Sequence, residues 1–436
     1  MREIKISSDN LVLSLLSISE SANVCILDAC NDFYANSNLL IAGINPVESL
    51  QFSEDNAEQT LENFDKKIAQ SNLAGIFTID YDFGLKLEKI ASGSKKLDSF
   101  SQPDIFLALF ECLLIHDYRT HQTFLDGNAK KFDGVIERIL QNQIHENNKI
   151  TEKVRAKINI KSNFTKKNYL QTVKKIQEYI SRGDSYQTNL TQQFRAKLPK
   201  NLTAQKIFWQ LKKDHPAPFS AFIKRSDDTV ISASPERFCT VKNQIIFCSP
   251  IKGTRPRGKS AAEDEHLKRE LLSSEKDRAE NIMIVDLLRN DIGKVCRYGS
   301  VEVENLCSLE THPTYHHLVS TMRGELKNNL SFGEIIKAIF PCGSITGAPK
   351  IRTMQIIDEL ESASRGLSMG AIGYVGFDKN LEMSVAIRTL TIKNNQAIFN
   401  VGGGIVIDSD PESEYEETLV KAQAIFSALG VDKTFI

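Results

Sequence analysis

The sequence has 436 residues, of which 41% are hydrophobic and 25% charged, as expected for a globular protein with a sizeable core. Its 54 basic and 55 acidic residues leave a net charge of -1, which gives no support to nucleic-acid binding. An acidic ligand would therefore have to be bound by local cations. The eight cysteines show neither a Cys-x-x-Cys pair nor the spacing of metal ligands, which favours reduced thiols and a cytoplasmic location.

The N-terminal part of the chain contains apolar segments but no motif with a chemical role. The stretch at residues 11–16 is too short, and too close to acidic residues, for a convincing signal peptide. The longest apolar run, at 106–115, is interrupted by Glu111 and cannot span a bilayer, so we expect a core helix there and no membrane association. Residues 24–27 and 38–42 are typical of short buried strands.

A polar connector is predicted over residues 142–160, and it precedes a well-defined helix. Thr165 is a suitable N-cap, Tyr169 and Val173 begin a helical apolar repeat, and Gly183 stands where a C-terminal glycine is expected. The rest of the chain alternates short apolar strands with helices, and strands are expected at 184–191, 244–248, 370–377, 383–392 and 397–401.

Two predicted helix starts carry pairs of carboxylates. Asp277 and Glu280 lie three residues apart, as do Glu414 and Glu417, so each pair shares one helix face. One interpretation is that these charges are solvated and only favour the positive end of the helix dipole, since acidic residues are common at helix starts. The other is a divalent cation between the two helices, because Mg²⁺ takes a few carboxylates together with water and substrate oxygens.

Three segments rich in glycine and proline are candidates for ligand contact. Lys252 lies in Ser249–Gly258, where prolines and glycines set the backbone and can hold an amine against a ligand. Residues 346–349 lead into a helix whose N–H groups could receive an anion. Gly402–Gly404 follows a strand and permits close approach of a ligand to the backbone. Each segment could equally be a tight turn or a bulge.

The second half of the chain contains these and similar runs in a characteristic order: Ser234–Phe238, Ser249–Gly258, Asp277–Asn281, Gly343–Lys350, Gly373–Tyr374, Ile387–Thr389, Gly402–Ile405 and Asp410–Thr418. Together they resemble the chorismate-utilising enzymes, which include the component I chains of anthranilate and aminodeoxychorismate synthase and the isochorismate and salicylate synthases. The resemblance covers about residues 165–430 and implies an α/β (α+β) fold of layered, mainly antiparallel sheets with outer helices. Residues 1–150 are then the N-terminal region of the component I type, packed against the catalytic region.

The resemblance also implies a metal site. Mg²⁺ is expected on Glu280 and Glu417, with support from Glu414 and Asp277. There it would offset the repulsion between these carboxylates and an acidic substrate.

The same resemblance implies that the substrate is chorismate. The residues expected around it are Gln187, Thr254, His317, Thr346, Tyr374, Arg388, Gly402, Gly403 and Gly404. Tyr374 and Arg388 are expected at the enolpyruvyl carboxylate, which an arginine fork suits. The alternation at 384–388 could also place Arg388 on a solvated strand face.

Lys252 within Pro-Ile-Lys-Gly-Thr is similar to the aminodeoxychorismate synthases, since anthranilate synthases usually carry Ala there. The implied reaction replaces the C4 hydroxyl of chorismate with an amine, in p-aminobenzoate and folate biosynthesis. Lys252 would add at C2 as the C4 oxygen, protonated by Glu236, departs, and ammonia would then displace it by attack at C4. Burial and the cations of Arg255 and Arg257 are expected to favour the neutral lysine amine, whereas Arg237 would oppose protonation of Glu236.

Gln187 stands where the isochorismate and salicylate synthases carry a lysine that activates water, and glutamine cannot act as that base. No cysteine lies in a Gly-x-Cys-x-Gly elbow, so ammonia is expected from a separate glutamine amidotransferase subunit. The alternative is anthranilate synthase component I, although Ile26–Ala29 stands in place of its tryptophan-sensing Leu-Leu-Glu-Ser run. A non-catalytic subunit that only senses chorismate or tryptophan would show a degraded site, whereas the family positions are filled here.

Overall fold

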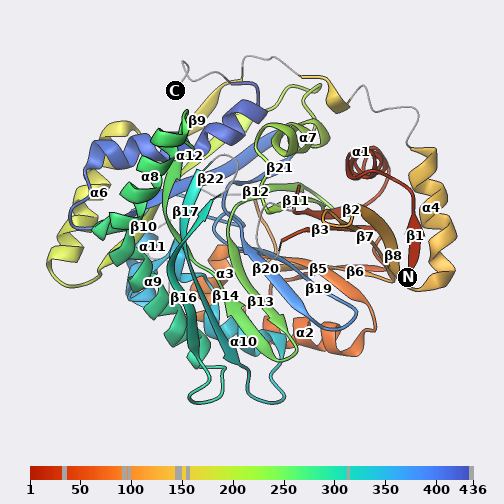
Figure 1. The fold of residues 1–436 in the computed structure, drawn as a ribbon, viewed down its shortest axis with the longest axis horizontal. Coiled ribbons are helices and arrows are strands. Elements are labelled where there is room, and N and C mark those ends of the chain that lie inside the picture. The colour runs from red at the N-terminus through yellow and green to blue at the C-terminus, as the bar shows by residue number, and fades with distance from the viewer. Residues whose placement is uncertain are drawn as a thin grey trace.

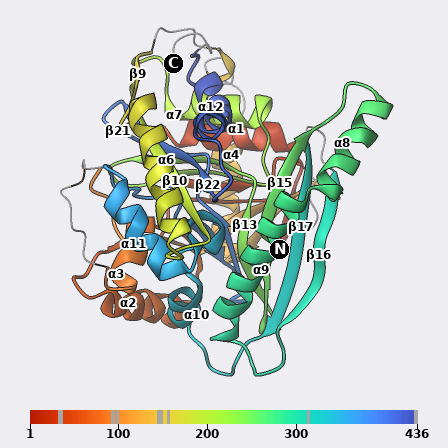
Figure 2. The same cartoon turned by 90° about the vertical axis from the view of Figure 1, so that its left-hand side faces the viewer.

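The computed structural model describes residues 1–31, 37–90, 96, 100–142, 150–153, 158–311 and 315–431. Two antiparallel sheets pack against each other, and helices cover their outer faces (Figures 1 and 2). The layered, mainly antiparallel architecture expected from the sequence is therefore confirmed. The polar connector predicted over 142–160 lies largely outside the described residues.

The first sheet combines strands from both halves of the chain. Among the described residues it has 12 strands, in the order β1 (Arg2–Ile4), β8 (Gln122–Gly127), β7 (Cys112–Asp117), β3 (Leu39–Ile44), β2 (Val24–Asp28), β11 (Phe219–Lys224), β12 (Thr229–Ser234), β21 (Thr389–Lys393), β22 (Gln396–Ile405), β10 (Gln187–Lys197) and β18 (Gly347–Ala348), with β9 (Ile160–Ser162) paired to β10. Because β2 pairs with β11, the N-terminal region continues the sheet that carries the later strands.

The second sheet also combines strands from the N-terminal region and from the later part of the chain. Within the described part of the chain it has 10 strands, in the order β15 (Ile251–Pro256), β17 (Tyr315–Glu325), β14 (Ile245–Cys248), β13 (Arg237–Lys242), β20 (Leu381–Val385), β19 (Ala371–Val375), β5 (Ala74–Ile79), β6 (Ile105–Phe110) and β4 (Glu48–Phe52), with β16 (Glu302–Thr311) paired to β17. Here β5 joins the N-terminal region to β19. The two regions are thus hydrogen-bonded to each other in both sheets.

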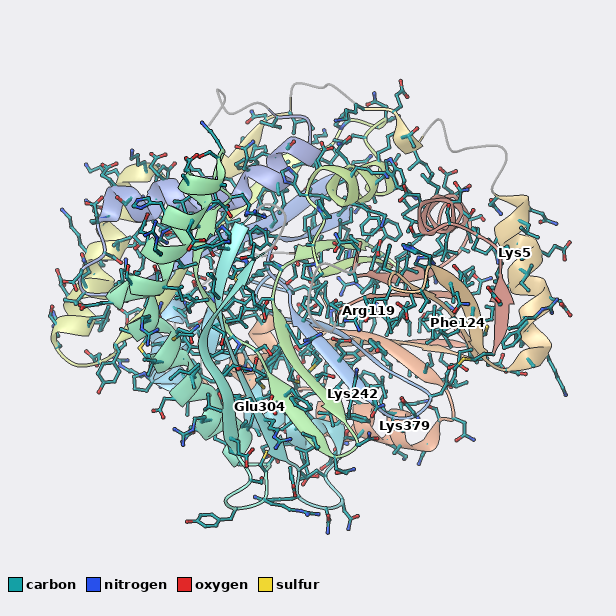
Figure 3. All side chains as sticks on the ribbon, in the orientation of Figure 1. Lys5, Arg119, Phe124, Lys242, Glu304 and Lys379 are labelled. Carbon is teal, nitrogen blue, oxygen red and sulfur yellow. The ribbon has the colours of Figure 1, made fainter. Side chains whose placement is uncertain are left out.

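The α-helices are α1 (Ser8–Ile18), α2 (Ala57–Gln70), α3 (Tyr81–Leu87), α4 (Phe132–Gln141), α6 (Lys166–Ser181), α7 (Ala204–Asp214), α8 (Ala261–Ser273), α9 (Glu275–Gly293), α10 (Phe332–Ile339), α11 (Lys350–Leu360) and α12 (Pro411–Ala428), and the short 3₁₀ turns are η1 (Ala129–Lys131) and η2 (Gly343–Ile345). Helices α1, α7 and α12 pack on the first sheet, and α2, α9 and α10 pack on the second. Apolar side chains such as Ile76, Phe106 and Ile372 fill the space between the sheets. Figure 3 shows these dense layers, with the exposed Glu304 on the outer strand β16.

The core helix predicted at 106–115 is wrong. The segment forms β6 in the second sheet and β7 in the first, and the chain crosses between them at Glu111. All residues of β6 are buried, because one face meets the first sheet and the other meets the helices of the second. A strand buried on both faces reads as a continuous apolar run, which periodicity cannot distinguish from a helix. Within the described residues, no helix combines the length and apolar character needed to cross a bilayer.

The single strand predicted at 383–392 is also wrong. The chain leaves β20 in the second sheet, crosses at 386–388, and enters β21 in the first. Arg388 has φ +49, a left-handed conformation that interrupts any regular strand. Arg388 therefore does not occupy the solvated strand face that the alternation allowed.

The predicted starts of the site helices are confirmed by their caps. The Ser274 hydroxyl accepts a hydrogen bond from Asp277 N–H at 3.2 Å at the start of α9. The Asp410 carboxylate accepts one from Ser413 N–H at 2.9 Å at the start of α12, where Pro411 is the first helical residue. Thr165 caps α6 through Asn168 N–H at 3.2 Å. These local rules fix where the acidic helix turns begin.

The core between α1 and α7 allows a test of how the two regions unfold. Trp209, the one tryptophan of the sequence, is 7% exposed and shares a hydrophobic cluster with Leu15 of α1, which is 0% exposed. Leu15→Ala should lower the free energy of unfolding by about 2–5 kcal/mol. Trp209 fluorescence and far-UV circular dichroism should shift together to lower urea concentrations.

The matched control is Leu140→Ala, at a leucine that is 45% exposed on α4, which should leave the urea midpoint nearly unchanged. A Trp209 transition that stays at the wild-type midpoint in Leu15→Ala would show that the N-terminal helix unfolds independently of the region around α7.

Candidate active site

A cavity of about 710 Å³ opens between the ends of the two sheets. Strands β10 and β22 of the first sheet and β15 and β17 of the second contribute to its walls, together with α9 and α12. The predicted site residues that line it are Glu236, Lys252, Thr254, Asp277, Glu280, His317, Arg388, Gly402, Gly403, Gly404, Glu414 and Glu417. The fold thus gathers residues that are spread over much of the second half of the chain.

Two crossings of the chain between the sheets form part of the cavity wall. Glu236 lies between β12 of the first sheet and β13 of the second, and Arg388 lies between β20 of the second and β21 of the first. The crossings are bonded to each other: Val385 N–H donates to the Glu236 carbonyl and Ala233 N–H donates to the Arg388 carbonyl, each at 3.1 Å. The backbone on both sides therefore holds the acid and the cation in place.

The two carboxylates of α9 have different partners. Asp277 Oδ2 pairs with Arg255 Nη2 at 3.1 Å. Glu280 Oε2 accepts a hydrogen bond from Gln187 Nε2 at 3.3 Å and lies 4.0 Å from Lys252 Nζ. The Gln187 Oε1 atom is buried and has no hydrogen-bond partner. A buried acceptor without a donor is expected to meet a ligand or water, so this end of the site is incomplete by itself.

The pKa values of the two α12 carboxylates are shifted in opposite directions. Glu414 accepts a hydrogen bond from the Ser409 hydroxyl at 2.6 Å, and burial raises the pKa of Glu414. Burial would also raise the pKa of Glu417, but Lys421 at 2.7 Å and the nearby Lys276 hold it below its usual range. Of the two, Glu417 is the carboxylate whose ionised form is favoured by its surroundings.

These four carboxylates line one cavity without forming a compact cluster. Across the described residues, no group of three or more His, Cys, Asp or Glu side chains is close enough to hold a metal ion. A cation here would have to rely on one or two carboxylates and on oxygens from water or a ligand, which is a common binding mode for Mg²⁺.

Lys252 lies in β15 beside a bulge that requires glycine. Its side chain is 15% exposed. The next residue, Gly253, has φ +78, and the register of β15 on β17 shifts at this point. A Cβ on Gly253 would lie only 3.0 Å from Cβ of Asp277. The bulge thus directs the lysine into the cavity while the strand stays paired.

The cations expected beside Lys252 are already paired with carboxylates. Arg255 Nε contacts Glu270 at 2.7 Å, and Arg257 Nε contacts Asp264 at 2.7 Å. Their charges are largely compensated, so the structure does not support their predicted influence on the lysine. Lys252 Nζ instead lies 4.0 Å from the Glu280 carboxylate of α9.

Glu236 has the surroundings of a proton donor. It is 7% exposed, and its Oε1 atom is buried without a hydrogen-bond partner. Burial raises the pKa of Glu236, and a hydrogen bond from Ser344 and the charges of Lys252 and Lys421 only partly oppose this. A carboxyl group kept protonated near neutral pH can donate its proton to a departing oxygen.

Arg237 does not act on Glu236 in the way that its place in the sequence suggested. Its Nη2 pairs with Glu382 Oε1 at 2.9 Å, and its guanidinium lies 5.2 Å from the centre of the Phe219 ring. Neither Arg237 nor its partner Glu382 lines the cavity that Glu236 lines, so this cation is engaged elsewhere.

A polar pair lies on the β15–β17 side of the cavity. Thr254 Oγ1 and His317 Nδ1 are 2.9 Å apart, and the imidazole packs on Tyr315 with 4.2 Å between ring centres. Both predicted residues are therefore brought to the site, and the contact between them orients the histidine ring.

The glycine triplet is required by neighbouring backbone and side chains. A Cβ on Gly402 would overlap the Leu190 carbonyl, and one on Gly404 would overlap the Gln187 amide nitrogen. A Cβ on Gly403 would meet only side-chain ends, the nearest being Glu414 Oε2 at 3.2 Å. Gly402 and Gly404 thus let β22 lie close to β10 at the cavity floor.

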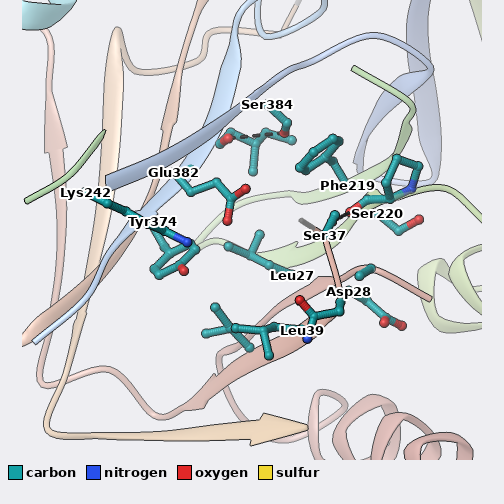
Figure 4. A pocket seen from close by; sticks show the side chains of 16 residues that line it. Leu27, Asp28, Ser37, Leu39, Phe219, Ser220, Lys242, Tyr374, Glu382 and Ser384 are labelled. Atoms are coloured by element: carbon teal, nitrogen blue, oxygen red, sulfur yellow. Dashed lines mark hydrogen bonds between the residues drawn. The ribbon is translucent and has the colours of Figure 1, made fainter. Parts of the chain in front are cut away.

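Three predicted residues are not part of the cavity lining: Gln187, which is bonded to the lining residue Glu280, Thr346 and Tyr374. Thr346 is fully buried, and its hydroxyl donates to the Cys342 carbonyl at 3.1 Å. Tyr374 lines a second, smaller cavity of about 80 Å³, together with Lys242 and Glu382 (Figure 4). The structure therefore does not bring Tyr374 to the carboxylate site assigned to it, because the alternation of β19 turns it to another face.

The cavity also contains residues that sequence reasoning missed. They are Asn189, Lys276, Ser344, Asn400 and Lys421. Lys421 Nζ contacts Glu417 at 2.7 Å and donates to the Gly402 carbonyl at 3.0 Å. Its position four residues after Glu417 on α12 is the signal that could have identified it, since residues four apart share a helix face.

Comparison with known proteins places these features in context. A family model described as chorismate binding enzyme matches residues 22–427. The match includes the cavity and most of the N-terminal region.

Relatives with two different names align over most of the chain. Aminodeoxychorismate synthase component 1 of Escherichia coli (strain K12) is 39% identical over 389 residues, 88% of this chain and 83% of that protein. Anthranilate synthase component 1 of Aquifex aeolicus (strain VF5) is 38% identical over 350 residues, 77% of this chain and 70% of that protein. The solved anthranilate synthase component I from Streptococcus pneumoniae TIGR4 has a TM-score of 0.78 and 28% identity, covering 90% of this chain and 93% of that chain.

The glycine triplet offers a matched pair of substitutions. Gly404→Ala should displace the Gln187 side-chain amide and destabilise the protein by about 1–3 kcal/mol, because the buried Gln187 side chain occupies the space that a methyl group would need. Gly403→Ala should be nearly neutral, since flexible side-chain ends can move. Thermal unfolding of the two variants measures the difference, and equal melting temperatures would contradict this account of the cavity floor.

Proposed function

The chain belongs to the family of chorismate binding enzymes, and on that premise we propose that it aminates chorismate at C4 to give 4-amino-4-deoxychorismate, a step towards p-aminobenzoate and folate. The observation that carries the proposal is the placement of Lys252 and Glu236 in one cavity, the lysine beside Glu280 and the acid buried with a raised pKa.

Glu236 supplies the proton that the leaving group needs. Hydroxide is a poor leaving group, so the C4 oxygen has to depart as water. The buried, protonated carboxyl donates its proton to that oxygen as the C4–O bond breaks. Exclusion of water around Glu236 strengthens the effect of this hydrogen bond.

Lys252 acts as the nucleophile. Its amine adds at C2 and forms a C–N bond, the ring double bond shifts, and the C4–O bond breaks. Ammonia then adds at C4, the double bond shifts back, and the lysine amine leaves from C2. Splitting one displacement into two allylic steps gives each a good leaving group.

Mg²⁺ fits the acidic side of the cavity. Glu280 on α9 and Glu417 on α12 are the carboxylates suited to hold it, with Glu414 in support, whereas Asp277 is engaged by Arg255. The buried Gln187 Oε1 next to Glu280 supplies a further oxygen at this end. When bound, the ion would offset the negative charge of a substrate carboxylate.

Arg388, Thr254 and His317 also line the cavity and are available to the remaining oxygens of the substrate. A guanidinium is suited to a carboxylate, and chorismate carries two. The ammonia is proposed to come from a separate glutamine amidotransferase subunit. The eight free cysteines support a reducing, cytoplasmic setting.

The alternative function is that of anthranilate synthase component I, because relatives of that name share the fold and align over much of the chain. The two functions differ in product. A lysine at position 252, directed into the cavity, favours amination at C4, since the proposed covalent step depends on its amine.

The product decides between these functions. Purified chain supplied with chorismate, Mg²⁺ and ammonium should form 4-amino-4-deoxychorismate, identified by mass spectrometry. Glutamine should replace ammonium only when an amidotransferase subunit is added. Anthranilate and pyruvate as the main products would refute the proposal, and so would isochorismate.

The metal site is tested by removing charge. Glu280→Gln and Glu417→Gln should each raise the Mg²⁺ concentration needed for half-maximal turnover by about 10- to 100-fold, because each removes one negative charge from the metal site. Glu416→Gln is the matched control on α12, since Glu416 is 60% exposed and pairs with Lys166. Full activity in EDTA would show that the carboxylates serve only as helix-start charges.

Lys252 is tested by two replacements. Lys252→Ala loses the amine and Lys252→Arg keeps the charge without the nucleophile, so both should lose amination by about 100-fold or more. Wild-type protein given chorismate without ammonia should gain mass on Lys252, and Glu236→Gln should slow that gain. A Lys252→Arg variant with near wild-type turnover, together with no adduct on the wild type, would leave Lys252 a purely electrostatic contact.

A further inference from the structure

A buried arginine outside the cavity is bonded to two segments that line it. The Arg365 side chain is 1% exposed. It donates two hydrogen bonds to Glu361, from Nη2 to Oε1 at 2.7 Å and from Nε to Oε2 at 2.9 Å. Its guanidinium also lies 4.4 Å from the centre of the Tyr81 ring. The carboxylate and the ring fix the direction of its remaining N–H groups.

Those N–H groups donate to two backbone carbonyls beside the cavity. Nη1 donates to the Ile345 carbonyl at 3.0 Å, and Nη2 donates to the Asn189 carbonyl at 2.8 Å. The Asn189 side chain also donates to the Ile345 carbonyl at 3.0 Å. Turn η2 and strand β10 are thus fastened to one another through Arg365.

The fastened turn carries a residue that shares the cavity with the proposed proton donor. Ser344, one position before Ile345, lines the cavity together with Glu236, and its hydroxyl acts to lower the pKa of that carboxyl. Cys342 Sγ lies 3.3 Å from the Ser344 hydroxyl on its other side. The position of Ser344 therefore depends on where the Ile345 carbonyl is held.

We propose that Arg365 is a positioning residue for the proton donor of the reaction, acting through the Ile345 carbonyl and the Ser344 hydroxyl to orient the Glu236 carboxyl. The catalytic meaning of this role rests on the proposed function. Lysine cannot replace arginine here, because a single ammonium cannot make the planar fork to Glu361 and also reach both carbonyls.

If Arg365 positions Ser344, loss of Arg365 should change the pKa at which Glu236 titrates. The charged and titratable groups that face it are Lys252 of β15, Lys421 of α12 and Cys342 beside η2. A hydrogen bond from Ser344 favours the carboxylate, so its loss raises the pKa of Glu236 further. The protonated form then persists to higher pH, and the alkaline fall of a rate that needs this proton moves upward.

The experiment follows this carboxyl directly. The infrared carbonyl stretch of protonated Glu236, assigned by its absence in Glu236→Gln, is recorded against pH on the protein without substrate. Ser344→Ala and Arg365→Lys should each raise the midpoint by about half a pH unit or more. Ser344→Thr, which keeps the hydroxyl, should retain the wild-type midpoint. The double variant should shift no further than Ser344→Ala alone, because both changes break one chain of contacts.

Turnover provides the second readout. Ser344→Ala and Arg365→Lys should lower kcat by about 10- to 100-fold with little change in the KM for chorismate, since a misplaced donor affects the chemical step more than binding. If Arg365→Lys does not fold, Glu361→Gln weakens the same fork with little change of shape and takes its place.

An Arg365→Lys or Glu361→Gln variant with the wild-type midpoint would overturn the proposal, because a merely structural arginine leaves the titration of Glu236 unchanged. A wild-type midpoint in Ser344→Ala would overturn it as well. Absence of amination by the wild type would instead refute the proposed function, while the infrared titration, which needs no turnover, would still decide the role of Arg365.

Discussion

The site depends on the packing of two sheets between which the chain has to cross. Apolar side chains such as Phe106 and Ile372 hold the sheets together, and each such burial contributes about 1.5–3 kcal/mol. The crossings that carry Glu236 and Arg388 are hydrogen-bonded to each other. The proposed acid Glu236 and the cation Arg388 therefore lie on backbone that connects both sheets, which is more rigid than a surface loop.

The site also depends on the balance of charges in the cavity. The first turns of α9 and α12 favour carboxylates, because a helix N-terminus carries partial positive charge. Facing each other across a cavity, the same carboxylates repel, and Lys252 and Lys421 compensate for them. Burial has the opposite consequence for Glu236, whose pKa it raises. Carboxyl groups whose pKa values are shifted in opposite directions within one cavity are the arrangement that acid–base chemistry needs.

Local rules predicted much of the fold correctly. Strands β2 and β3 follow from short apolar runs, and the starts of α6, α9 and α12 follow from their caps. The errors share one cause. At 106–115 and 383–392 the chain changes sheet around a single charged residue, Glu111 or Arg388, and the sequence pattern shows neither the crossing nor the partner strands.

The sequence by itself determined which residue types the site would contain, because its motifs include a lysine, several carboxylates and a glycine triplet in a characteristic order. Only the tertiary structure decided which of them meet. It placed Tyr374 in another cavity, paired Arg237 with Glu382, and brought Ser344 to Glu236. The physical reason is that strand alternation and crossings between sheets assign each side chain to a face, and this assignment depends on pairings between residues far apart in the chain.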